Sequence, residues 1–118
     1  MLDGLIALLK TTKLPVVYGA WGVGHAPPLP YLVVMEQYRD DLYADDQHFY
    51  CVHNYDVELY FDRKDPRVEQ SIEDLFATHD IVFEVAADQY LSNERMYQRI
   101  YSIELDKAQP LKEENLNA

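Results

Sequence analysis

Hydrophobic positions repeat with a helical period at the start of the chain and with a strand period over most of the remaining residues. An apolar stripe with spacings of three and four residues predicts a short amphipathic helix over residues 3–12; it consists of Leu2, Leu5, Ile6 and Leu9. The segment "LPVVYGAW" is rich in β-branched and aromatic residues and predicts a strand over residues 14–20. "YLVVMEQY", residues 31–38, is nearly continuous in apolar residues, which is typical of a central strand buried on both faces.

The segment between these two strands, "GVGHAPPLP", is rich in glycine and proline. It does not fit a phosphate-binding loop, because no Gly-Lys-Ser/Thr follows and no helix opens after the glycines. Its three prolines favour a stiff, extended segment, so an extended arm and a plain loop both remain open.

The longest alternating run spans residues 49–62. One parity is mainly apolar and consists of Phe49, Cys51, His53, Tyr55, Val57, Leu59 and Phe61. The other parity is largely polar, as a half-buried antiparallel strand requires. The run is longer than most strands, so we expect a bulge or bend in it. "RDDLYADDQ", residues 39–47, carries four aspartates and predicts an exposed turn before this strand.

A second helix follows the long strand. Asp65 and Pro66 form the expected N-cap and first-turn pair, and the apolar stripe formed by Val68, Ile72, Leu75 and Phe76 predicts a helix over residues 66–78. That stripe should pack on a sheet face. Two further strands are expected at "IVFEVAA", residues 81–87, and "RMYQRIYSIEL", residues 95–105.

The predicted order is therefore α-β-β-β-α-β-β. It indicates an α+β fold in which two helices pack on a mainly antiparallel sheet. The length of 118 residues suits a single domain, which we place at residues 1–105. Residues 106–118 contain few apolar side chains and a proline, so we expect a flexible C-terminal tail.

The charge balance is strongly acidic, with 10 Lys and Arg against 21 Asp and Glu, a formal net charge of −11. This disfavours specific binding of nucleic acid through the phosphate backbone, and also docking on an anionic membrane. An acidic protein can instead contact basic partners, mimic DNA, or line a channel through which DNA passes. The simpler interpretation is that the charge keeps the protein soluble.

The cysteine usage is compatible with a reducing cytosol. Cys51 is the only cysteine, so there is no disulfide framework and no Cys-x-x-Cys motif. The apolar start "MLDGLIALLK" lacks a basic leading region and a cleavage site, so we do not interpret it as a signal peptide. No run approaches the roughly 18 apolar residues that a membrane span needs.

No group of residues predicts catalysis, a metal site or a cofactor. The four histidines lack metal-ligand spacing, and His53, on the apolar parity, is expected to be a hydrogen-bonded core histidine. The aspartates of residues 39–47 do not match a calcium-binding loop. Glu36, Glu58 and Glu84 lie on separate predicted strands, where a carboxylate pair could form in space. Cys51 is expected to be inert on the inward face of a strand. We therefore expect a protein that is not an enzyme.

Several segments, taken in order, resemble a known family. They are "LPVVYGAW", "PYLVVM", "YADDQHFY", "YDVELYFDRKDPRVEQSIEDLF" and "RMYQRIYSIEL". Together they resemble the small neck and tail-completion proteins of long-tailed (siphovirus) phages, the tail terminator or head–tail joining family. In that family, a similar pattern consists of a Pro-Tyr strand, an Ala-Asp turn, an "(I/V)ELY" strand and a Lys-Asp-led helix. The likeness covers residues 14–105.

The resemblance implies a structural role in the virion, with assembly in the host cytoplasm. Such proteins form homo-oligomeric rings, commonly hexamers, at the end of the tail tube, where they contact the tail tube protein and the head–tail connector protein. We expect the loops at residues 39–47 and 22–30 to meet adjacent subunits or tail-tube proteins, with Tyr43, Trp21 and Tyr38 as aromatic anchors. The candidate interface residues are Trp21, Tyr38, Asp40, Asp41, Tyr43, Asp45 and Asp46. The alternative function, from another class, is an acidic DNA mimic that inhibits a host nucleic-acid-binding protein.

Overall fold

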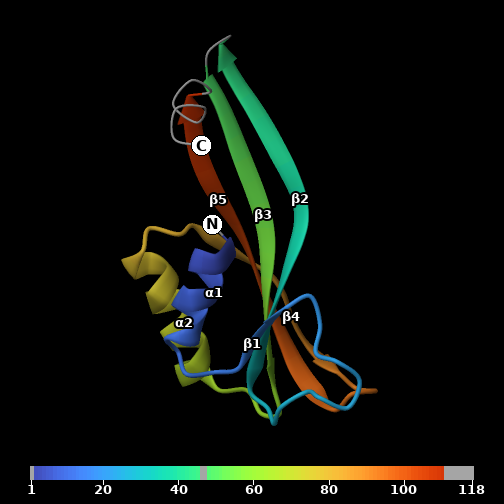
Figure 1. Cartoon of the computed structure of the whole chain (residues 1–118). Coiled ribbons are helices and arrows are strands. Elements are labelled where there is room, and N and C mark those ends of the chain that lie inside the picture. The colour runs from blue at the N-terminus through green and yellow to red at the C-terminus, as the bar shows by residue number, and fades with distance from the viewer. Residues whose placement is uncertain (1, 46–47, 111–118) are drawn as a thin grey trace.

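The computed structural model describes the backbone of residues 2–45 and 48–110, and the side chains within these ranges outside residues 38–52 and 106–110. The elements, in chain order, are α1 (Leu2–Lys10), β1 (Val16–Tyr18), β2 (Tyr31–Asp45), β3 (His48–Phe61), α2 (Pro66–Thr78), β4 (Phe83–Leu91) and β5 (Met96–Pro110). The predicted α+β class and the order α-β-β-β-α-β-β are confirmed (Figure 1).

The strands form one five-stranded sheet in the order β1-β2-β3-β5-β4. Three of the neighbouring pairs are antiparallel, whereas β1 runs parallel to β2 along Val16–Tyr18. This parallel pair requires residues 19–30 to carry the chain back to the start of β2. Gly19 leaves β1 with φ +94°, a left-handed conformation that favours glycine, and its amide donates to the carbonyl of Val34 at 2.9 Å.

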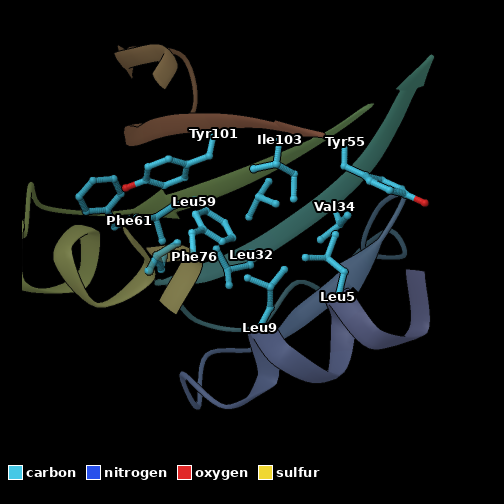
Figure 2. Packing of buried hydrophobic residues seen from close by; sticks show 12 residues of the cluster. Leu5, Leu9, Leu32, Val34, Tyr55, Leu59, Phe61, Phe76, Tyr101 and Ile103 are labelled. Carbon is cyan, nitrogen blue, oxygen red and sulfur yellow. The ribbon is translucent and has the colours of Figure 1, made fainter. Parts of the chain in front are cut away.

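Both helices pack on the same face of the sheet, where the core lies (Figures 1 and 2). The side chains of Phe49 and Cys51 lie outside the described residues. From Tyr55 to Phe61 the alternation predicted for β3 is confirmed, because Tyr55, Val57, Leu59 and Phe61 are all buried. They meet Leu5 and Leu9 of α1 and the apolar stripe of α2. The start of α2 was also predicted correctly: the side chain of Asp65 accepts from the amide of Arg67 at 3.1 Å, and proline occupies the first turn.

The turn predicted at residues 39–47 is wrong for most of its length. β2 continues to Asp45, and its backbone pairs with β3 from Arg39 opposite His53 to Asp45 opposite His48. Pairing along a long partner strand has overridden the polar composition of the segment. Only Asp46 and Gln47 lie between the strands, and they are outside the described residues.

Irregular pairing occurs in β2, not in β3 where it was expected. Register shifts lie between Glu36 and Tyr38 and between Tyr43 and Asp45, whereas β3 pairs with β5 without interruption. A further shift lies in β4, between Val85 and Ala87. β5 also continues beyond the expected end at residue 105, because its backbone pairs with β3 as far as Pro110 opposite His48.

The distal parts of β2, β3 and β5 project beyond the helices as a three-stranded arm (Figure 1). We define the arm as residues 37–45, 48–54 and 104–110. β1 pairs with β2 only as far as Val34, and β4 pairs with β5 only as far as Ile103. Within the described chain, both edges of the arm are therefore unpaired strands. The arm accounts for the elongated shape, with principal extents of 51 × 28 × 24 Å.

Candidate interaction site

The described carboxylates and histidines are distributed over both faces of the sheet. Among these residues, no cluster of three or more His, Cys, Asp or Glu could hold a metal ion. Glu36 shares a face with Tyr55 on the helix side of the sheet, whereas Glu58 lies on the opposite, open face. Over the same part of the chain, no helix is long and apolar enough to cross a membrane.

His53 lies on β3 at the base of the arm and forms a hydrogen bond with a residue of the neighbouring strand β2. Its Nδ1 is 2.5 Å from Oε2 of Glu36 on β2, and its ring stacks on Tyr55 with a centroid separation of 6.1 Å. The expectation of a hydrogen-bonded histidine is confirmed. Its side chain retains 22% of its exposure, however, so it borders the core and is not inside it.

A cluster of charged side chains fastens α2 to β4 and β5. Arg99 lies 2.7 Å from Asp88 and 3.0 Å from Glu73, and Lys64 lies 2.7 Å from Asp88 and 2.6 Å from Glu69. These groups connect the helix to two strands by ion pairs that are partly shielded from water. A paired, partly buried network of this kind fixes the position of the helix on the sheet.

The titration behaviour of this cluster follows from its pairing. The hydrogen bond from Lys64 lowers the pKa of Asp88, against the opposing effect of burial. Burial opposes the charge of Arg99, but its contact with the Tyr101 hydroxyl and its pairing with Glu73 raise its pKa. The pairing therefore favours the charged forms of Lys64, Asp88 and Arg99, and these groups lie against opposite charges. The geometry of the cluster is that of an ion-pair network between α2, β4 and β5.

The open face of the sheet carries a concave feature, which we call the open-face groove. Its volume is 530 Å³, and it lies between residues 19–26 and the outward side chains of the sheet. The lining residues are Gly19, Ala20, Trp21, Gly22, Ala26, Tyr31, Val33, Met35, Glu58, Tyr60, Leu91, Glu94 and Met96. A groove of this size lies within the range of about 300–1,000 Å³ that is typical of ligand sites.

Three aromatic rings follow one another along this groove. Trp21 meets Tyr31 edge to face at a centroid distance of 5.8 Å, and Tyr31 lies 5.5 Å from Tyr60. The Tyr60 hydroxyl donates to Oε1 of Glu58 at 2.8 Å and accepts from Nε2 of Gln98 at 2.8 Å. Burial, together with the hydrogen bond to Glu58, raises the pKa of Tyr60 to about 12. The phenol is thus neutral and held in place at physiological pH.

The predicted interface residues fall into two separate regions. Trp21 lies in the groove, where it is half-buried and its indole nitrogen is shielded from solvent. Tyr38, Asp40, Asp41, Tyr43 and Asp45 lie along β2 in the arm, and Asp46 is outside the described residues. Trp21 is therefore not grouped with the others. Sequence reasoning missed Tyr31, Tyr60, Glu58 and Glu94 as groove residues, although the outward parity of β3 identified Glu58 and Tyr60 as surface positions.

Comparison with known proteins provides no family assignment. No protein-family model matches the chain, and no curated protein matches it. The role of the chain must therefore be inferred from the arm, the groove and the resemblance of its segments.

Proposed function

We propose that the chain is a non-enzymatic structural protein of a long-tailed phage, a tail terminator or tail-completion subunit that caps the tail tube and joins the tail to the head. The observation that carries the proposal is the arm, whose β2 and β5 edges are unpaired in the described chain. The order of sequence segments that resemble the neck and tail-completion family adds to it.

Unpaired strand edges favour association between copies. An exposed edge presents a row of backbone donors and acceptors, to which a second strand can add. The two edges of the arm belong to different strands, so pairing of the β2 edge of one copy with a β5 edge of the next would be head-to-tail. Head-to-tail contacts generate closed rings where the rotation permits. In this proposal the ring, by resemblance a hexamer, contacts the tail tube protein on one side and the head–tail connector on the other.

The pairing of three acidic residues disfavours DNA mimicry. Glu69, Glu73 and Asp88 are engaged with Lys64 and Arg99, so they do not form an open row of negative charge. A DNA mimic requires carboxylates free to occupy the phosphate sites of a basic protein. Part of the remaining charge would line the ring lumen, and reversal of Asp45 and Asp46 to lysine should then impair DNA passage.

Native mass measured across a dilution series, with negative-stain imaging of large species, tests the proposal. A closed oligomer of ring size is expected, alone or on addition of purified tail tubes. Tyr43→Ala and Trp21→Ala should each weaken ring assembly or tail joining. Unchanged assembly in both variants would count against a role of Tyr43 and Trp21 in the interface. A monomer that ignores tail tubes but displaces DNA from a basic protein in a gel-shift competition would favour the inhibitor instead.

A further inference from the structure

The open-face groove combines aromatic surface with negative charge. Its lining includes the rings of Trp21, Tyr31 and Tyr60, and two carboxylates, Glu58 and Glu94. No lysine, arginine or histidine is among its lining residues. The groove is therefore complementary to a ligand that has both a flat apolar surface and a positive charge.

The three rings lie in a row along the groove, and each is partly exposed. Tyr31 and Tyr60 project from neighbouring positions on β2 and β3, since these two residues are directly opposite in the sheet register. Trp21 extends the aromatic row from the segment that folds over the sheet. Met35 and Met96 add adaptable apolar surface at the same groove. Glu58 is oriented by the Tyr60 hydroxyl, so one carboxylate is held beside the rings.

We propose that the open-face groove binds an arginine side chain carried by an extended segment of a partner protein. A guanidinium group is planar, stacks on aromatic rings and pairs with carboxylates through two parallel hydrogen bonds. Lysine matches this site less well, because its ammonium is compact and strongly hydrated. All the groove residues belong to one copy of the chain, so this inference goes beyond ring formation and does not depend on it.

The chain contains its own reporter for this test. Trp21 is the only tryptophan, so fluorescence excited near 295 nm reports on the groove. The probe is an acetylated and amidated Gly-Arg-Gly-Arg-Gly peptide, and its matched control replaces both arginines with citrulline, which has the same shape without charge. The arginine peptide should give a saturable fluorescence change, with an affinity about tenfold or more above that of the citrulline peptide. A peptide with lysine in place of both arginines should fall between them.

Variants distinguish binding at the groove from a general attraction of the acidic protein for a positively charged peptide. Glu58→Gln and Glu94→Gln should each weaken binding of the arginine peptide several-fold, and Glu58→Gln retains an oxygen that can accept from Tyr60. Glu84→Gln is the matched control, because it removes the same charge from an exposed position on β4 outside the groove.

Chemical shifts of the Met35 and Met96 methyl groups provide a second readout. Equal binding of the arginine and citrulline peptides would overturn the proposal, and so would equal effects of all three variants. It would also be overturned if neither the fluorescence nor the methyl chemical shifts changed up to about 10 mM peptide.

Discussion

The hydroxyl of Tyr101 on β5 donates a hydrogen bond of 2.8 Å to Oε2 of Glu73 on α2, and the same hydroxyl oxygen accepts from Nε of Arg99 at 2.8 Å. The ring of Tyr101 is fully buried between Phe76 and Phe83. One side chain therefore contributes both to the core and to the charged cluster above it. This explains why burial, together with the bond to Glu73, raises the pKa of Tyr101.

Tyr101→Phe should lower the free energy of unfolding by about 1–2 kcal/mol, because the ring is retained while two charged groups lose a hydrogen-bond partner. Urea denaturation monitored by circular dichroism measures this change. Tyr90→Phe is the control, since Tyr90 is 51% exposed and should change stability by less than about 0.5 kcal/mol. Equal small effects of the two substitutions would contradict the role assigned to the Tyr101 hydroxyl.

Asp88→Asn should reduce the change in the free energy of unfolding with pH in the acid range. The pairing with Lys64 lowers the pKa of Asp88 in the folded protein below its unfolded value. Its contribution is therefore present above the unfolded pKa of about 4 and is lost as pH falls through the lower folded value. The effect is modest, because the side chain is partly exposed. Urea midpoints of the wild type and the variant between about pH 2 and pH 6 should converge at the acid end, whereas Glu84→Gln should leave this dependence intact.

The alkaline titration of the tyrosines can be measured by absorbance near 295 nm. Tyr60→Phe should remove from it a deprotonation step that occurs at higher pH than that of an ordinary tyrosine. The pKa of about 12 exceeds the ordinary value of 10, so the folded state favours the neutral phenol. This contribution to stability is fully present below pH 10 and is lost as pH rises through about 12. Glu58→Gln should shift the step to lower pH, since a negative neighbour is removed. A late step that survives unchanged in Tyr60→Phe would show that another tyrosine causes it.

Asp40→Pro and Asp41→Pro should differ sharply, although the residues are adjacent on β2. In an edge strand, successive amides point alternately to the paired strand and to the open side. Proline is tolerated only where the amide points outward. The variant whose amide points outward should keep the wild-type melting temperature and lose the ring assembly proposed above. The other variant should be destabilised, because it breaks the β2–β3 ladder. Native mass and thermal melting measure the two effects, and normal assembly of both variants would exclude edge pairing through this part of β2.

Local patterns were sufficient to predict the elements of the compact part of the fold. The cap at Asp65 and the apolar stripe of α2 determine that helix from neighbouring residues alone, and the alternation from Tyr55 to Phe61 determines the buried face of β3. These signals are local because each depends on spacing within one element.

The ends of the long strands could not be predicted in the same way. Residues 39–45 are polar and resemble a turn, yet they are in a strand because β3 lies beside them. The backbone of residues 106–110 is likewise in a strand because it pairs with His48–Val52. Such pairing depends on contacts between distant segments, which composition does not record. The groove was missed for the same reason, since the chain must fold back at Gly19 before Trp21 can reach Tyr31.

The position of β3 between β2 and β5 has a consequence for synthesis of the chain. β2 and β3 are neighbours in sequence and can form a hairpin early, but β5 is made after the other described strands and pairs with β3 along its whole length. A nascent chain that has not yet reached β5 presents a long β3 edge without its natural partner, and such edges are sites of misassembly. Synthesis of β5 thus closes the exposed edge of β3 and shortens the time in which a growing chain can pair with a neighbouring copy.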